Sequence, residues 1–290
     1  GADPLNLFIV VETGDHHVSV LDGDKLERLH RFPSRYALHG GPKFSPDGRF
    51  VYFASRDGWI SKFDLYNLVV VAEVRAGLNT RNAAVSGDGK WVLVANYLPH
   101  SLVLLDAVDL SLVRIIPTWN VAGDKTSRVS AVYDAAPRKS FVVALKDVPE
   151  AWELSYDPAA EPVAEGLVHD FQYKEGEFKP GMFHPRRTIL TDYLDDFFFT
   201  QSYDEILGSS RSATKGQVIL LDGRKKIAEL DLPGMPHLGS GITWKWKDPA
   251  GRSRTVMASP NLNAGLVTVI DLDTYETVKQ IETLGPGFFL

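Results

Sequence analysis

The sequence contains no cysteine among its 290 residues. This absence excludes disulfide-stapled scaffolds, thiolate zinc sites, iron–sulfur clusters, cysteine nucleophiles and the Cys-x-x-Cys-His attachment of a c-type haem. Long apolar runs are also missing, because a typical one, residues 67–72, is far shorter than the ~20 residues that a membrane-spanning helix needs. We therefore expect a protein that does not span a membrane.

Basic residues are fewer than acidic ones, at 31 against 37, which gives a net charge of −6. A globally negative surface disfavours the phosphate backbone of nucleic acids, so we expect no nucleic-acid partner, although a local basic patch stays open. The sequence also lacks the Gly-x-Gly-x-x-Gly fingerprint, the P-loop and the His-Glu-x-x-His zinc motif. A nicotinamide-dependent dehydrogenase therefore finds no support in it.

A repeat of about forty residues is present instead. Residues 44–53 are echoed by residues 85–94, and the Asp-Gly turns within them lie 41 residues apart. Apolar strands that end in Asp22, Asp64 and Asp106 recur every 42 residues. Asp-Gly between alternating apolar runs is typical of tight hairpins, and four short strands per ~40–45 residues are typical of a propeller blade. We interpret these aspartates as turn-forming rather than catalytic.

The period predicts one ring of blades rather than the two domains that a prior of ~150 residues per domain would suggest. It weakens over residues 128–163 and 187–232 and returns over residues 255–283. We predict an all-β propeller of four-stranded blades with about six blades in a single domain, residues 1–290. The aromatic run 197–199 is expected to pack between sheets.

Propellers gather function where loops from successive blades converge. His39, Arg81 and Arg128 precede the first strand of successive units at the same phase, and His237 takes the equivalent place much later. Imidazole ligates iron and guanidinium binds carboxylates bidentately, so the set predicts a haem-like pocket. Two alternatives remain open. His39 could be a structural histidine, and Arg81 and Arg128 could form salt bridges between blades.

Longer motifs carry a family resemblance. They are residues 36–39 followed by a Ser-x-Asp-Gly-Arg turn, and residues 55–58, 80–82, 95–99, 128–131, 144–147, 235–241 and 285–289. Together they resemble the d1 domain of cytochrome cd1 nitrite reductase and, within that group, the NirF family of haem d1 biosynthesis proteins in denitrifying bacteria. The matches run in order over nearly the whole chain.

The resemblance implies an eight-bladed propeller that binds haem d1 or its late precursor in a central cavity. It makes His39 the proximal iron ligand and places His237 on the distal side, so these two are the candidates for catalysis. Asp170 is a further candidate for acid–base chemistry. The residues that would bind the tetrapyrrole are His39, Arg56, Arg81, Tyr97, Arg128, Lys146 and His237, of which the arginines and the lysine would hold carboxylates and Tyr97 would line the ring.

The sequence departs from the reductase in having neither a Cys-x-x-Cys-His motif nor a second distal histidine segment. We therefore do not expect nitrite reduction. We expect either oxidoreductase-type modification of a side chain on a late tetrapyrrole intermediate, or binding of that intermediate until a partner protein takes it. The alternative is a non-catalytic propeller scaffold for protein–protein interaction or tetrapyrrole carriage.

The resemblance also implies a periplasmic location. It implies other haem d1 biosynthesis proteins and the cd1 nitrite reductase as partners, and it leaves a homodimer open. Because eight blades are implied and about six are recognisable, we expect further C-terminal blades outside residues 1–290.

Overall fold

The computed structural model describes residues 1–165, 176–209 and 215–290, and strands dominate these ranges. Asp170 lies outside the described residues. The helical segments in them are three short 3-10 turns, η1(Pro4–Asn6), η2(Ala136–Arg138) and η3(Leu238–Ser240). None of the helices in the described ranges is long and apolar enough to cross a membrane.

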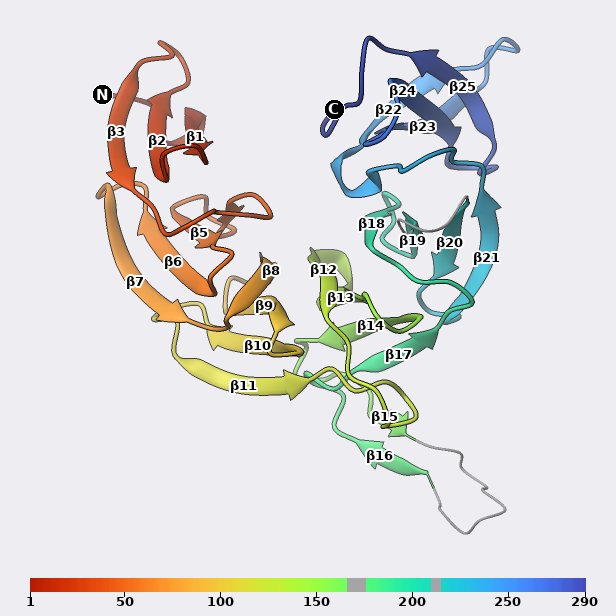
Figure 1. Ribbon diagram of the computed structural model, residues 1–290, viewed down its shortest axis with the longest axis horizontal. Coiled ribbons are helices and arrows are strands. Elements are labelled where there is room, and N and C mark those ends of the chain that lie inside the picture. Colours follow the sequence, from red (N-terminus) through yellow and green to blue (C-terminus); the bar gives the residue numbers. More distant parts are fainter. Residues whose placement is uncertain (166–175, 210–214) are drawn as a thin grey trace. The chain divides into compact units, whose positions relative to one another are not determined.

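The first three sheets are antiparallel meanders, in which each strand pairs with its sequence neighbours (Figure 1). The first sheet has three strands, β1(Leu7–Glu12), β2(His17–Asp22) and β3(Arg28–Pro33). The second has four, β4(Lys43–Phe44), β5(Phe50–Ala54), β6(Trp59–Asp64) and β7(Val69–Arg75). The third has β8(Asn79–Val85), β9(Trp91–Leu98), β10(Ser101–Asp106) and β11(Leu112–Pro117).

The later sheets repeat this plan with one interruption. The fourth sheet contains β12(Val129–Ala135), β13(Ser140–Leu145), β14(Glu150–Ser155) and β17(Arg186–Ile189), and a separate hairpin pairs β15(Val163–Glu165) with β16(Glu177–Lys179). The fifth sheet has β18(Asp196–Phe199), β19(Glu205–Ser209), β20(Gly216–Leu220) and β21(Lys225–Leu230). The sixth has β22(Ile242–Lys247), β23(Ser253–Pro260), β24(Leu266–Asp271) and β25(Thr277–Glu282).

Six blade-like sheets in the described ranges match the predicted number, whereas the later boundaries were wrong. The fourth strand of the fourth sheet is β17, which follows the β15–β16 hairpin. Hence the unit predicted over residues 128–163 ends too early, and the unit predicted over residues 187–232 begins inside the preceding sheet. The hairpin insertion interrupts the sequence period, and this is why the boundaries were misplaced. The last sheet also begins upstream of residue 255, at β22.

The turn-forming interpretation of the repeated aspartates is confirmed. Asp64 ends β6, and its Oδ1 accepts from the backbone N–H groups of Tyr66 and Asn67. The Arg49 guanidinium donates to its Oδ2, and this pairing lowers the pKa of the Asp64 carboxyl to about 2. Gly48 and its counterpart Gly89 both have φ of 72°, the left-handed conformation that such hairpins require. These residues build the blades.

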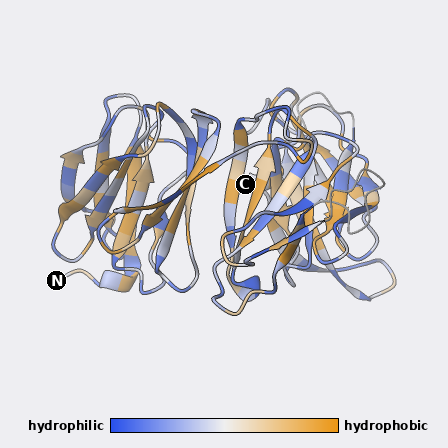
Figure 2. Cartoon of the chain, turned by 90° about the horizontal axis from the view of Figure 1, so that it is seen from below, coloured by the Kyte–Doolittle hydropathy of each residue, from blue (hydrophilic) through white to orange (hydrophobic). Residues whose placement is uncertain are grey.

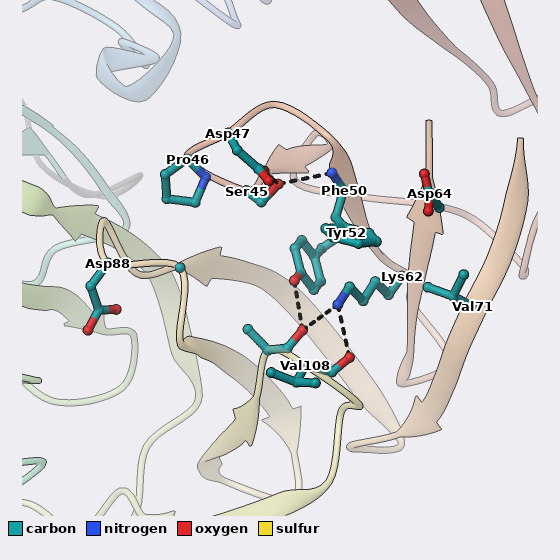
Figure 3. Close-up of a pocket in the computed structure, with 12 residues that line it drawn as sticks. Ser45, Pro46, Asp47, Phe50, Tyr52, Lys62, Asp64, Val71, Asp88 and Val108 are labelled. Atoms are coloured by element: carbon teal, nitrogen blue, oxygen red, sulfur yellow. Dashed lines mark hydrogen bonds between the residues drawn. The ribbon is translucent and has the colours of Figure 1, made fainter. Parts of the chain in front are cut away.

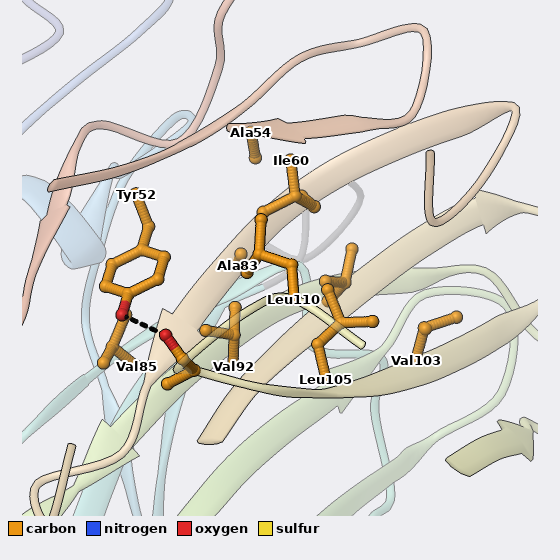
Figure 4. Packing of buried hydrophobic residues seen from close by; sticks show 11 residues of the cluster. Tyr52, Ala54, Ile60, Ala83, Val85, Val92, Val103, Leu105 and Leu110 are labelled. Carbon is orange, nitrogen blue, oxygen red and sulfur yellow. Dashed lines mark hydrogen bonds between the residues drawn. The ribbon is translucent and has the colours of Figure 1, made fainter. Parts of the chain in front are cut away.

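The apolar faces of neighbouring sheets pack against each other, and hydrophobic residues concentrate on the strands (Figure 2). One cluster joins the second and third sheets (Figure 4) and contains Tyr52, Ala54, Ile60, Ala83, Val85, Val92, Val94, Val103, Leu105, Ala107 and Leu110. The Tyr52 hydroxyl donates to the Ala107 carbonyl at 2.9 Å, and burial raises the pKa of Tyr52 to about 12. Phe197 is fully buried, as the packing interpretation of the aromatic run expects.

The chain divides into two compact units. The first comprises residues 1–143 and 153–186, and the second comprises residues 144–152 and 187–290. The predicted site residues are divided between them: the first unit holds His39, Arg56, Arg81, Tyr97 and Arg128, and the second holds Lys146 and His237. The predictions of a single propeller domain and of further C-terminal blades stay predictions.

Candidate functional site

His39 lies on the connection that leads into β4, close against β8. Its backbone N–H donates to the Ala54 carbonyl at 2.9 Å, which fixes the connection to the second sheet. Gly40 follows with φ of 85°, and a Cβ at that position would lie 2.5 Å from the Cβ of Asn82. Only glycine allows this approach. The tight passage therefore brings the imidazole to the start of the next sheet.

Arg81 and Tyr97 are the two residues that the β8–β9 ladder leaves unpaired. Asn79 pairs with Leu98, Thr80 with Asn96, and Asn82 with Ala95, so the register skips Tyr97 on one strand and Arg81 on the other. Each irregularity is a bulge, which redirects a side chain locally. Because one bulge lies on each strand, the two offset each other, and regular pairing resumes beyond them.

The His39 ring contacts Arg81 twice. Nδ1 lies 2.7 Å from the Arg81 carbonyl oxygen, so a proton on Nδ1 completes that hydrogen bond and Nε2 carries the lone pair. An imidazole that binds a metal through Nε2 needs this tautomer, with its proton on Nδ1. The Arg81 guanidinium lies against the same ring, with Nη1 2.8 Å from Nδ1 and 2.9 Å from Nε2.

Tyr97 lies between two further guanidinium groups. The Arg56 Cζ is 5.7 Å from the centre of the phenol ring, and the Arg128 Cζ is 5.4 Å from it. Arg56 lies on the β5–β6 turn and Arg128 directly precedes β12, so the two cations come from different sheets. The backbone N–H of Thr80 donates to the Arg56 carbonyl, which joins this group to the start of β8.

The first unit thus brings together five of the seven predicted binding residues. His39, Arg56, Arg81, Tyr97 and Arg128 are all half-buried, and each lies at the start of an inner strand or on the adjoining turn or strand end. An imidazole, a phenol ring and three permanent cations at one edge are suited to a flat, anionic ligand that carries a metal. For Arg81, the structure shows a contact with a histidine in place of a salt bridge.

Lys146 is held differently, in the second unit. It lies on the turn between β13 and β14, and its Nζ is 2.5 Å from Asp195 Oδ1. Both side chains are mostly buried, at 17% and 16% exposure. The lysine charge that was predicted to hold a tetrapyrrole carboxylate is therefore already paired with a carboxylate of the protein.

His237 also faces an acid. Its Nε2 is 3.5 Å from Asp196 Oδ2, and its Nδ1 is 2.7 Å from the carbonyl oxygen of Phe288. The Phe289 ring packs edge-on against the imidazole. The motifs at residues 235–241 and 285–289, far apart in sequence, therefore meet at this histidine.

Three supporting residues escaped the sequence analysis. Asp195 and Asp196 give no signal of their own as an adjacent pair of acids, yet each faces a predicted site residue. Lys43 donates from Nζ to the Gly40 carbonyl at 2.8 Å, beside His39, and burial lowers the pKa of its ammonium group. A lysine two residues after a Gly-Gly pair is too common a pattern to have indicated this.

A cavity of about 640 Å³ lies elsewhere in the first unit, between the second and third sheets (Figure 3). Lys62 extends into it, donating to the carbonyls of Ala107 and Val108 and lying over the Phe50 ring at 4.0 Å. Its ammonium group is thus satisfied from within the protein. None of the predicted site residues lines this cavity.

The family described as "Cytochrome D1 heme domain" matches residues 2–290 of this sequence. The chain belongs to the cytochrome d1 heme domain family. This confirms the predicted family, and the site residues can now be considered within it.

Two curated relatives from Pseudomonas aeruginosa differ in how similar they are to this chain. The "Dihydro-heme d1 dehydrogenase" is 60% identical over all of this chain and 53% of its own length. "Protein NirF" is 29% identical over 97% of this chain and 78% of its own length. The chain is therefore more similar to the dehydrogenase than to NirF, which corrects the NirF assignment. It spans about half the length of the dehydrogenase.

Solved structures agree with the fold. "Dihydro-heme d1 dehydrogenase NirN in complex with DHE" matches with a TM-score of 0.87 and 59% identity over all of this chain and 56% of that one. The β-propeller domain of Myceliophteria_thermophila Cps50 (Swd1) matches with a TM-score of 0.62 at 12% identity, covering 96% of this chain and 83% of that one, and so shows the fold alone. The predicted class, an all-β propeller, is confirmed.

Proposed function

We propose that this chain is the tetrapyrrole-binding part of a dihydro-haem d1 dehydrogenase and that its substrate binds at the His39–Arg81–Tyr97 edge of the first unit. The observation that carries the proposal is the meeting of one imidazole, one phenol ring and three guanidinium groups from three successive sheets. The 60% identity to a dihydro-heme d1 dehydrogenase supports the choice of substrate.

Each group has a defined part in binding. His39 supplies the axial nitrogen for the substrate iron, and its hydrogen bond to the Arg81 carbonyl sets the ring orientation. Arg56 and Arg128 bind carboxylate side chains of the macrocycle as bidentate donors. Tyr97, held between them, offers an aromatic surface to the macrocycle.

Dehydrogenation removes two electrons and two protons from the substrate, so an electron acceptor and a base must take part. The candidate base that the family resemblance suggests is His237, whose Nε2 lies 3.5 Å from Asp196 Oδ2. The electrons pass to an oxidant, for which ferricyanide serves in the assay below.

The test is anaerobic titration of the protein with dihydro-haem d1, followed by addition of ferricyanide. We expect a shift in the absorption spectrum on binding and, after the oxidant is added, a product lighter by two hydrogens in mass spectrometry. His39→Ala is the matched variant and should abolish the shift. Binding without conversion would favour tetrapyrrole carriage, the alternative function, and no binding would refute the proposal.

We further infer a periplasmic location, which a cysteine-free chain tolerates because it offers no thiol to oxidise. The proposed protein partners are other haem d1 biosynthesis proteins and the cd1 nitrite reductase that uses the product. Cell fractionation tests the location. Size-exclusion chromatography, alone and with the reductase, tests these partners and a homodimer.

A further inference from the structure

We propose that Lys43 is a specificity-determining residue of this site: its ammonium group provides a second place for a carboxylate, next to the connection that carries His39. The inference rests on the proposed function and deepens it. Arg56 and Arg128 lie beside the Tyr97 ring and receive carboxylates there. With Lys43 as a further carboxylate contact, the preferred substrate is a tetrapyrrole that carries carboxylates on more than one side of the macrocycle.

The position of Lys43 is fixed close to His39. Lys43 is the first residue of β4, and its Nζ reaches back to donate to the Gly40 carbonyl at 2.8 Å. Gly40 and Gly41 have φ of 85° and 71°, so the chain turns sharply between the imidazole and the lysine. The ammonium group therefore lies beside the backbone of the residue that follows His39.

The ammonium group of Lys43 has no acidic partner. In the part of the chain that the structure describes, the Gly40 carbonyl is its one hydrogen-bond acceptor, and its Nζ forms no ion pair. An ammonium group has three N–H donors, so two of them find no acceptor in those residues. Lys43 therefore has donors to offer to a ligand.

A lysine elsewhere in the first unit shows what an acid does. Lys139 donates to Asp157 at 2.8 Å, and this contact raises the pKa of the Lys139 ammonium group. At half-buried Lys43, burial lowers the pKa, and no charged group among the described residues counteracts it. Taking a cation partly out of water without a counter-charge costs free energy, and a ligand carboxylate offsets that cost.

The cations of the site form two groups. Arg56 and Arg128 share the Tyr97 ring, whereas Lys43 lies over none of the aromatic rings in the described ranges and contacts the Gly40 backbone instead. A flat ligand that pairs with both groups needs carboxylates at more than one position of its rim. Since one charge-assisted contact is worth about tenfold in affinity, the second group can select among tetrapyrroles by the placement of their acids.

The first experiment compares two ferric probes by spectrophotometric titration. Ferric coproporphyrin carries carboxylates on all four pyrroles, and ferric mesohaem carries them on two neighbouring pyrroles. We expect the unmodified protein to bind the coproporphyrin about tenfold more tightly, and Lys43→Gln to remove most of that advantage while mesohaem affinity changes little. The glutamine amide can still donate to the Gly40 carbonyl, so the variant removes the charge alone.

The control is Lys25→Gln, at an exposed lysine that pairs with Asp22, and it should leave both affinities unchanged. Lys43→Arg keeps the charge and should recover part of the preference for the coproporphyrin. Equal losses for both probes in Lys43→Gln, or no loss for either, would overturn the proposal.

The second experiment uses the unmodified protein, so it does not depend on the folding of a variant. Acetylation by sulfosuccinimidyl acetate is followed at Lys43 and Lys25 by mass spectrometry. Ferric coproporphyrin should slow acetylation of Lys43 about tenfold, its tetramethyl ester should slow it far less, and Lys25 should react at one rate throughout. Spectral binding of the coproporphyrin without protection of Lys43 would overturn this proposal and leave the proposed function standing. If no probe changed the spectrum, the proposed function would fail, and the role of Lys43 with it.

Discussion

The two units of the chain place cations at the ends of similar sheets but give them different partners. In the first unit, guanidinium groups lie against an imidazole and a phenol ring, at His39 and Tyr97. In the second, the Lys146 ammonium and the His237 imidazole each face a carboxylate. The contacts of the second unit join a base to an acid of the protein, whereas those of the first unit join guanidinium groups to rings. Under the proposed function, we expect the anionic substrate to bind at the rings of the first unit.

The sharpest test sets one histidine against the other. His39→Ala should weaken binding of ferric mesohaem by about 100-fold or more. Removing a residue that merely orients a metal ligand already lowers metal affinity by about 10–100-fold, and this change removes the proposed ligand itself. His237→Ala should change that affinity little. Spectrophotometric titration measures both, and added imidazole should restore the His39→Ala spectrum. A larger loss from His237→Ala would reverse the comparison.

The second prediction concerns stability in the second unit. Lys146→Met should lower the free energy of unfolding by ~2 kcal/mol, because it removes the Lys146 ammonium from the mostly buried Asp195 carboxylate. Mesohaem affinity should stay unchanged. Urea denaturation measures the loss, and the double variant with Asp195→Asn should recover part of it. A stable Lys146→Met protein that binds mesohaem poorly would place the lysine in the binding site.

Unlike Lys146, the arginines beside Tyr97 should affect mesohaem binding. Arg56→Met and Arg128→Met should each weaken mesohaem binding by about tenfold, the effect of one charge-assisted contact, and leave binding of the dimethyl ester nearly unaltered. Titrations with the two probes at fixed ionic strength make the comparison. Equal losses with both probes would mean that these arginines act on the macrocycle rather than on its carboxylates.

The smallest effect is expected at an acid of the first unit that has a phenol as its partner. The Tyr156 hydroxyl donates to Asp134 at 3.0 Å, and burial raises the pKa of Asp134 to about 6. A raised carboxyl pKa means that the folded state prefers the protonated form, so stability is full below about pH 4 and falls as the pH rises towards 6.

Asp134→Asn removes that loss, because the amide stays neutral and still accepts from Tyr156. It should add ~1–2 kcal/mol of stability at pH 8 and nothing at pH 4. Urea midpoints across this pH range provide the measurement. A gain of equal size at both values would assign the effect to something other than ionisation.

Much of the fold was predictable because its signals are local. The Asp-Gly turns and the strand-end aspartates recur where the backbone needs them, so the ends of β2, β6 and β10 at Asp22, Asp64 and Asp106 were predicted correctly. The start of the third sheet was not, because Arg81 was expected before the first strand of its unit and lies within β8. The fourth sheet was misplaced, since its last strand comes from beyond the β15–β16 hairpin and no short-range pattern records that return.

The site was predictable only in part. Equal phase in the repeat placed His39 and Arg81 together, and the structure shows them in contact. The acids opposite Lys146 and His237 were passed over, because pairing across a sheet end depends on tertiary structure and an Asp-Asp dipeptide carries no sign of it. The bulges at Arg81 and Tyr97 were likewise invisible, since the apolar alternation continues on both sides of them.

The offsetting bulges have a consequence for how such a site can evolve. A single inserted residue would shift every later side chain of a strand to the opposite face, but one insertion on each partner restores the alternation beyond them. The residues at positions 81 and 97 can therefore be substituted, or both deleted, while the core on either side keeps its packing. Substitutions at these two positions should therefore alter the contacts of the candidate site while the fold of the sheet is kept.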